Sequence, residues 1–192
     1  ASLLLERNRR VGATLTEQQY AQAEQALQAA IMLNPNQWQL QSIYAEYIVD
    51  RKPEDALALR QRLAENVPNP QNYLMLGRMA MRMMTEEQAQ DRKEFLPDLA
   101  GNAFEQAYAM DPENTEIQDN YSEYLRVSGK RDKVLDLFAD DEKQLWRFYL
   151  RDGQYAKAES ILKRVIEQEP ENTEYLAGMV QVQRSLNQFD NA

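Results

Sequence analysis

The chain has 192 residues, 43% of them apolar, and its 22 Lys and Arg against 31 Asp and Glu give a formal net charge of −9. Such an acidic chain is a poor ligand for nucleic acid, because phosphate contacts need clustered basic side chains. The absence of Cys and His excludes disulfides, zinc sites, cysteine nucleophiles and histidine bases. No apolar run approaches the roughly 20 residues of a membrane span, so we expect no direct membrane insertion by these residues.

The lack of cysteine also bears on the compartment. It fits both a reducing cytosol and an envelope protein that avoids stray thiols, and of the two the bacterial periplasm is slightly favoured over the cytoplasm. The charge is uneven along the chain: residues 1–96 carry 11 basic and 12 acidic side chains, whereas residues 97–192 carry 11 and 19.

Helix-forming residues dominate throughout, and the 6 Gly and 7 Pro lie mostly between periodic segments, which predicts an all-α fold. Residues 1–12 resemble the end of a helix cut off at its beginning. Thr16 and Gln19 have the spacing of a capping box, and they open a helix that ends at Asn34-Pro35. Further helices are predicted over 40–50, 53–67 and 70–84, and, after an insertion at 85–98, over 100–111.

The second half continues the alternation of helices and breaks. A helix after Pro112 ends at Gly129, and the next one, over 134–138, is short. Asp141 caps a helix that ends at Gly153, and two more are predicted over 155–168 and 173–186. Residues 187–192 match the start of residues 153–158, which predicts that a further helix begins at Asn187.

Alternate helices repeat one pattern, in which a small residue, a large apolar residue and another small or branched residue precede a closing Pro. Ala23 and Ala56 are 33 residues apart, as are Pro35 and Pro68. A pair of helices repeated at this period indicates a helical solenoid. The clearest copies are Ala23, Leu27, Ala30 and Pro35; Ala100, Phe104, Ala107 and Pro112; and Ala158, Leu162, Val165 and Pro170.

These residues resemble the tetratricopeptide repeat family, whose first helix carries a large residue, a Leu and a Gly in the order shown by Tyr73, Leu76 and Gly77. The resemblance covers nearly the whole chain. It implies an all-α, right-handed α-solenoid of antiparallel helix pairs, with about five pairs and partial repeats at both ends. We therefore expect residues 1–192 to form a single solenoid, a fragment of a longer protein, that is irregular at 85–98 and 130–141.

The chain departs from the family pattern at several positions. Arg60 stands where a second helix should carry a large apolar residue, and the neighbouring Leu59 is expected to take over its packing. Large residues also replace the first-helix glycine, which predicts wider or reoriented helix crossings. They include Tyr44, Trp146 and Val180, with Ser122 at the fourth such position.

A methionine-rich stretch runs from 75 to 84, with Met75, Met79 and Met83 at helical spacing on one face. We favour a place in the core between repeats, because thioethers fill irregular gaps. The alternatives are an adaptable hydrophobic binding surface and a copper site with thioether ligands. No metal ion or cofactor is predicted.

The resemblance also implies binding on the concave wall that the first helices form. Cationic side chains there could receive a carboxylate or an acidic peptide, although surface charges without a dedicated partner are an equal alternative. An acidic face at Glu116, Asp119 and Glu123 is read as solvated rather than catalytic. The partner-binding candidates are Trp38, Gln41, Leu74, Arg78, Met81, Arg126, Lys143 and Arg147.

The function predicted from the sequence is a non-catalytic scaffold that binds a protein or peptide on its concave face. An alternative is a segment of a bacterial cell-envelope assembly, for polysaccharide export or cytochrome c maturation. Such a segment would dock an enzyme or pore component, or contact a glycan through Trp38 and the tyrosines. A third hypothesis is an enzyme whose catalytic domain lies outside this chain.

Overall fold

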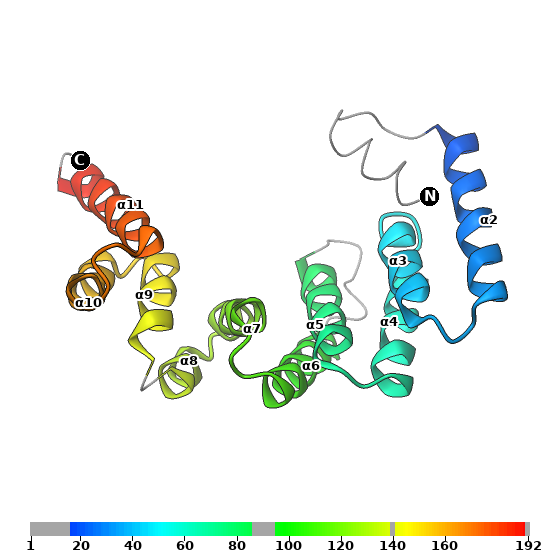
Figure 1. Cartoon of the computed structure of the whole chain (residues 1–192), viewed down its shortest axis with the longest axis horizontal. Coiled ribbons are helices and arrows are strands. Elements are labelled where there is room, and N and C mark those ends of the chain that lie inside the picture. Colours follow the sequence, from blue (N-terminus) through cyan, green and yellow to red (C-terminus); the bar gives the residue numbers. More distant parts are fainter. Residues whose placement is uncertain (1–15, 86–94, 139–140, 191–192) are drawn as a thin grey trace. The chain divides into compact units, whose positions relative to one another are not determined.

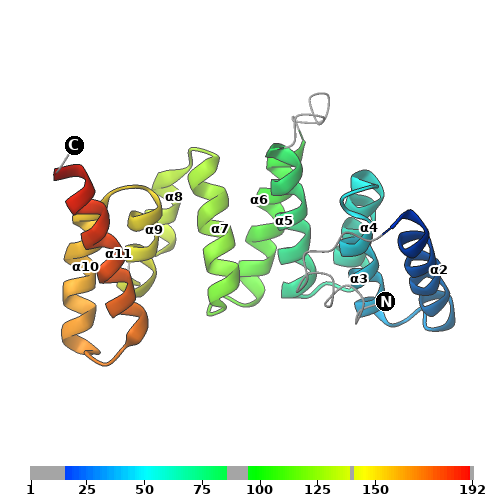
Figure 2. The same cartoon turned by 90° about the horizontal axis from the view of Figure 1, so that it is seen from above.

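The structure, a computed structural model, describes residues 16–85, 95–138 and 141–190 (Figures 1 and 2). Within these ranges it contains ten helices and no strand, which confirms the all-α helical-repeat fold. The helix end predicted for residues 1–12 and most of the insertion at 85–98 lie outside the described residues.

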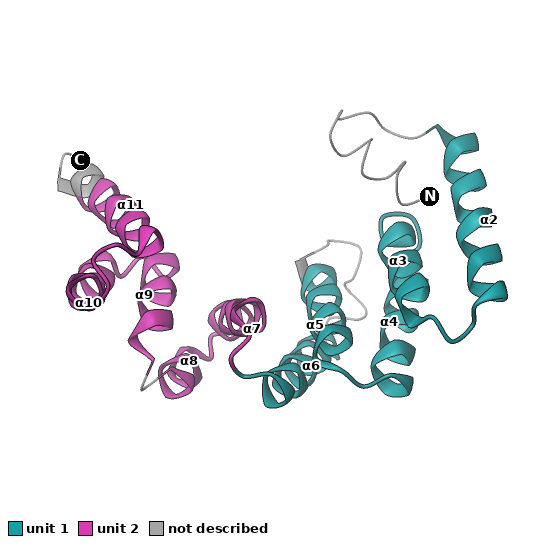
Figure 3. Ribbon diagram, viewed as in Figure 1, with its two compact units in different colours: residues 1–112 teal, residues 113–192 magenta. Residues whose placement is uncertain are grey.

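The chain divides into two compact units, residues 1–112 and 113–192 (Figure 3). Each consists of consecutive antiparallel helices. Unit 1 contains α2 (Glu17–Leu33), α3 (Trp38–Ile48), α4 (Pro53–Asn66), α5 (Pro70–Thr85) and α6 (Leu96–Met110). Unit 2 contains α7 (Thr115–Val127), α8 (Arg131–Leu137), α9 (Glu142–Arg151), α10 (Tyr155–Gln168) and α11 (Thr173–Asp190).

Local sequence signals set where the helices begin and end. The predicted capping box is present: the Gln19 amide donates to Thr16 Oγ1 at 3.2 Å, and the Thr16 amide donates to Gln19 Oε1 at 3.0 Å. Gly153, after α9, has a φ of 73°, a left-handed conformation that lets the Gln154 amide close the helix on the Tyr149 carbonyl at 2.9 Å.

In unit 1, α5 and α6 pack closely because Gly77 leaves room for an aromatic ring. A Cβ at Gly77 would lie 2.8 Å from Cε1 of Phe104, so only glycine fits against that ring. Met79 and Met83 are buried on the same helix, and Met75 is half-buried. The prediction that the methionine stretch belongs to the core is therefore confirmed for Met79 and Met83.

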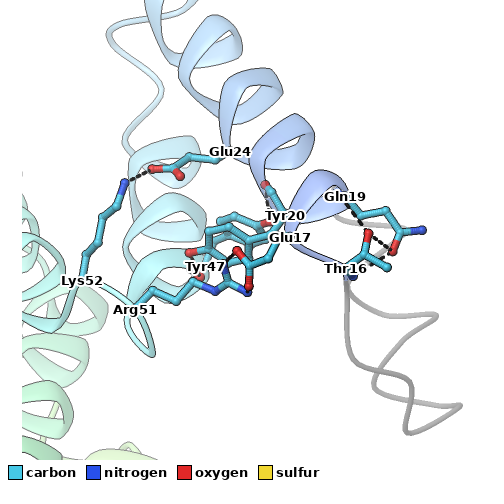
Figure 4. Close-up of polar contacts among 8 residues, drawn as sticks. All are labelled: Thr16, Glu17, Gln19, Tyr20, Glu24, Tyr47, Arg51 and Lys52. Atoms are coloured by element: carbon cyan, nitrogen blue, oxygen red, sulfur yellow. Dashed lines mark hydrogen bonds and ion pairs between the residues drawn. The ribbon is translucent and has the colours of Figure 1, made fainter.

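Aromatic and charged side chains join α2 to α3 (Figure 4). The rings of Tyr20 and Tyr47 stack with centroids 4.6 Å apart, and each hydroxyl donates to the backbone carbonyl of the other residue, at 3.2 and 2.8 Å. The Arg51 guanidinium lies 3.7 Å from the centroid of the Tyr20 ring and donates to both Glu17 oxygens, at 2.6 and 2.8 Å. These contacts hold α2 in place with few large apolar side chains.

A second carboxylate strengthens this joint. Glu24 accepts from Lys52 Nζ at 2.6 Å and from the Tyr44 hydroxyl at 2.9 Å (Figure 4 shows the lysine bond). The hydrogen bond from Lys52 lowers the pKa of Glu24 below its ordinary value, and burial raises the pKa of Tyr47 to about 12. At neutral pH Glu24 therefore stays ionised and the Tyr47 hydroxyl stays protonated, as their hydrogen bonds require.

Unit 2 has its own hydrophobic core between α9, α10 and α11. Trp146, 5% exposed, packs edge to face on Tyr175, with ring centroids 6.5 Å apart, and against Leu162 and Val165 of α10. A Cβ at Gly178 would lie 2.6 Å from Cζ3 of Trp146, so α11 makes room for the indole that replaces the family's glycine in α9. By contrast, α8 has only seven residues and contributes a single buried side chain, Val134.

Two expectations from the sequence are wrong. Arg60 is itself buried, at 4% exposed, while Leu59 is only half-buried, so Leu59 does not take over its packing. Residues 187–190 continue α11 rather than begin a new helix, because no Gly or Pro interrupts the helix at Asn187.

Candidate functional site

A groove in unit 2 lies along three first helices of successive pairs. In both Figure 1 and Figure 2, α9 lies between α7 and α11. The hollow has a volume of about 350 Å³, and its lining combines two cations, two carboxylates, an amide and an apolar floor. The lining residues are Asp119 from α7, Trp146, Arg147, Leu150 and Arg151 from α9, and Glu174 and Gln181 from α11.

Arg147 is the more enclosed of the two cations. Its Nε donates to Glu174 Oε1 at 2.8 Å, its Nη2 pairs with the same oxygen, and its Nη1 donates to Gln144 Oε1 at 2.8 Å. The guanidinium lies 5.7 Å from the Trp146 ring centroid, within the range of a cation–π contact. Arg147 thus links α9 to the start of α11, and its donors already have acceptors.

Arg151 makes the equivalent link on the other side of α9. Its Nη2 lies 3.2 Å from Asp119 Oδ1, and its Nη1 is 3.5 Å from the Asp119 carbonyl oxygen. One helix therefore carries two arginines, four residues apart, that pair with the helices on its two sides. The groove has no net charge from these four groups.

Lys143 is paired outside the groove lining. Its Nζ donates to Glu169, which follows the end of α10, and this hydrogen bond raises the pKa of Lys143 and lowers the pKa of Glu169. The Asn172 amide also donates to Glu169, at 2.9 Å. The Lys143–Glu169 ion pair therefore connects α9 to the turn between α10 and α11.

The charged side chains of the groove are paired with one another. Its two carboxylates, Asp119 and Glu174, each pair with an arginine of α9. Among the residues that the structure describes, no group of three or more Asp or Glu is placed to hold a metal ion. The ion pairs instead fix the positions of the three helices and so the shape of the groove.

Of the candidates that the sequence placed in unit 2, the structure brings only Arg147 into the groove. Arg126 pairs with Glu123 of its own helix, at 2.6 and 2.8 Å, and Lys143 lies beside the groove. Sequence reasoning missed Arg151, although its spacing of four residues from Arg147 places it on the same face. The predicted set of eight also lacked the other five lining residues, Asp119, Trp146, Leu150, Glu174 and Gln181.

The other candidates belong to unit 1, and one of them is wrong. Leu74 is 1% exposed, because it packs in the core of unit 1, so it offers no surface to a partner. Trp38, Gln41 and Met81 are half-buried, and the Gln41 amide donates to the Pro35 carbonyl at 3.0 Å. Arg78 is exposed on α5.

Comparison with known proteins agrees with this architecture. Residues 149–192 match the family model described as tetratricopeptide repeat. The structure is similar to that of TTC0263, a thermophilic TPR protein in Thermus thermophilus, with a TM-score of 0.57, 17% sequence identity, and coverage of 88% of this chain and 91% of that one. It is also similar to MamA, with a TM-score of 0.52, 12% identity, and coverage of 97% and 96%.

At these identities the two solved structures show the fold alone. None of the curated proteins compared with the sequence matches it. Among the described helices, none is both long enough and apolar enough to cross a membrane.

Proposed function

Because the chain carries tetratricopeptide repeats and folds as an all-α helical-repeat array, we propose that it is a non-catalytic scaffold that binds a segment of a partner protein in the groove of unit 2. Scaffolds of this fold generally serve protein–protein interaction. The observation that carries the proposal is the groove along α7, α9 and α11, whose walls are joined by the Arg147–Glu174 and Arg151–Asp119 ion pairs.

The ion pairs support binding because they position the groove before a partner arrives. A preformed surface loses little conformational freedom on binding, which improves affinity for a given contact area. The Trp146 ring, fixed by Gly178 and Tyr175, gives the floor the same rigidity.

The lining also suggests the chemistry of the bound segment. Leu150 is half-buried between the two arginines and offers an apolar contact, while Asp119 and Glu174 offer carboxylates at either side. A segment with an apolar side chain flanked by both acidic and basic side chains would fit this lining. Its affinity should fall as salt rises, because partly exposed charges are screened.

A displayed library of random peptides would test the proposal, followed by fluorescence anisotropy with the selected peptides. In the variant Gln181→Trp, a large ring enters the groove from α11, and we expect peptide affinity to fall by at least about tenfold, equivalent to about 1.4 kcal/mol. The control is Glu167→Trp, which adds the same ring at an exposed position of α10 outside the lining, and should leave affinity unchanged.

Two results would contradict the proposal. The library could return no peptide that binds, or the selected peptides could bind Gln181→Trp as tightly as the unaltered protein. Circular dichroism of both tryptophan variants checks that their helices are intact.

A further inference from the structure

The two arginines of the groove differ in how far their hydrogen-bonding capacity is used. Arg147 is 17% exposed, and each of its three nitrogen atoms has an acceptor on Glu174 or Gln144. Arg151 is 40% exposed, and its Nη2 lies 3.2 Å from Asp119 Oδ1. Among the residues that the structure describes, its one hydrogen bond runs from Nη1 to the Asp119 carbonyl oxygen and is 3.5 Å long.

These distances leave Arg151 with unused donors. Both exceed the roughly 2.7–2.9 Å of a charge-assisted hydrogen bond, so the pair with Asp119 is a loose one. A guanidinium has five N–H groups in a planar fork, which matches the two oxygens of a carboxylate. Arg151 can therefore bind a second carboxylate while it remains beside Asp119.

The α11 side of the same groove offers an open amide. Gln181 is exposed, and within the described part of the chain only its backbone carbonyl is engaged, by the Ser185 hydroxyl at 3.1 Å. A carboxamide both donates and accepts, so it can pair with the N–H and C=O of a peptide unit. A helix uses these backbone groups internally, so a segment bound in this way is extended.

The charge of unit 2 as a whole does not decide what binds here. Residues 113–192 carry 11 basic and 16 acidic side chains. At physiological ionic strength the Debye length is about 8 Å, so exposed charges farther away are largely screened. The nearest groups therefore set the preference, and among the four paired charges of the lining Arg151 is the group with capacity left.

We infer that the groove selects an extended acidic protein segment, in which an Asp or Glu side chain binds Arg151. A neighbouring apolar side chain of the segment lies on the half-buried Leu150, and its backbone pairs with the Gln181 carboxamide. Asp119 holds Arg151 in place and competes with the incoming carboxylate. That the ligand is a protein segment rests on the proposed scaffold function; the open donors of Arg151 do not.

The probes are peptides selected from the displayed library, labelled at the N-terminus and amidated at the C-terminus so that their only carboxylates are side chains. We expect Asp or Glu beside an apolar residue to be enriched. By fluorescence anisotropy, Arg151→Gln should weaken binding by about tenfold, because it removes a charge-assisted hydrogen bond. Asp119→Asn should tighten binding by about threefold, because it removes the internal competitor.

The opposite signs separate binding from a structural role, since an ion pair that only positions the helices would weaken binding in both variants. Replacing the acidic residue of the peptide by its amide should cost about tenfold against the unaltered protein and little against Arg151→Gln. Gln181→Leu keeps the size of the side chain without its amide, and should weaken binding by about threefold.

The matched control is Arg164→Gln. It removes the same charge and breaks another ion pair of α9, the one with Glu142, outside the groove lining. Peptide affinity should be unchanged. Circular dichroism checks that the helices of every variant are intact.

Four results would overturn the acidic segment: selected peptides without acidic side chains, equal weakening by Arg164→Gln, weakening by Asp119→Asn, or a full acid-to-amide loss against Arg151→Gln. Equally tight binding to Gln181→Leu would overturn the backbone pairing. Peptides that are blocked by Gln181→Trp but bind Arg151→Gln normally would retain the groove and remove this assignment alone. A library without binders would remove both.

Discussion

Arg60 in unit 1 and Trp146 in unit 2 both replace residues that the repeat pattern would make smaller or less polar, and the two units accommodate them differently. The Trp146 indole is larger than the glycine of the repeat pattern, and Gly178 of α11 leaves room for the ring. Arg60 brings a charge into the core, where its guanidinium lies 2.5 Å from Ser42 Oγ and 3.6 Å from Glu46 Oε2.

The difference shows how the fold compensates each departure. The volume of the indole is accommodated by close packing within unit 2, among apolar side chains of α10 and α11. A buried charge needs polar partners from a neighbouring helix, here Ser42 and Glu46 of α3. We therefore expect a large loss of stability when Trp146 is truncated, and little or no loss when Arg60 is replaced by an apolar side chain.

The largest effect is expected from Trp146→Ala. Removing a buried indole from the core of unit 2 should destabilise that unit by about 3–5 kcal/mol, because it loses apolar burial and leaves a cavity. Urea denaturation followed by circular dichroism measures the loss. A change below about 1 kcal/mol would mean that the indole is not the centre of this core.

Arg60→Met is expected to act in the opposite direction. An apolar side chain at this buried position should leave the free energy of unfolding unchanged or raise it by up to about 4 kcal/mol. The same urea titration applies, with Arg62→Met as the exposed control. A marked loss of stability in Arg60→Met alone would show that Ser42 and Glu46 compensate the charge fully.

Gly178→Ala tests the space left for the indole. The added methyl would lie 2.6 Å from Cζ3 and 2.8 Å from Cη2 of Trp146, and overpacking of this kind costs about 1–3 kcal/mol. Better helix propensity of Ala returns about 1 kcal/mol, so we expect a net loss of up to about 2 kcal/mol. In a Trp146→Phe background the loss should disappear; an equal loss in both backgrounds would place the clash elsewhere.

The smallest effect concerns the exposed joint between α2 and α3. Hydrogen bonds from Lys52 and Arg51 lower the pKa values of Glu24 and Glu17 below their ordinary 4.5. Their stabilisation is therefore present above pH 4.5 and lost as the pH falls through the lowered values. Amide hydrogen exchange in α2, measured across this range, should accelerate in acid, and less so in Glu24→Gln. An unchanged acid response in that variant would exclude Glu24 as a source.

The repeat itself could be predicted from the sequence, because its signals are local. The capping box at Thr16, the proline at Pro53 and the glycine at Gly153 each act within one turn, and the structure has them as predicted. The end of α11 shows the limit of such signals. The residues from Asn187 onward match the start of an earlier helix, but α11 continues through them because no Gly or Pro interrupts it there.

The candidate site was predicted less well, because its members meet across helices. Arg147 was identified from its helix face, but its partner Glu174 lies 27 residues further on, and the spacing between them specifies no contact. Leu74 has the same helical phase as the exposed Arg78, yet it is buried, because burial depends on what packs against each turn.

The sequence by itself determined that this protein is an all-α array of paired helices, since periodicity and caps are properties of neighbouring residues. The tertiary structure decided which charges already have partners and which buried side chain is a charge. In the sequence, Arg60 occupies a position where the repeat has an apolar residue, and Leu59 was expected to pack in its place. Only the packing of α3 and α4 showed that the Arg60 guanidinium is enclosed. Contacts of this kind depend on distances between helices, which no spacing within a helix records.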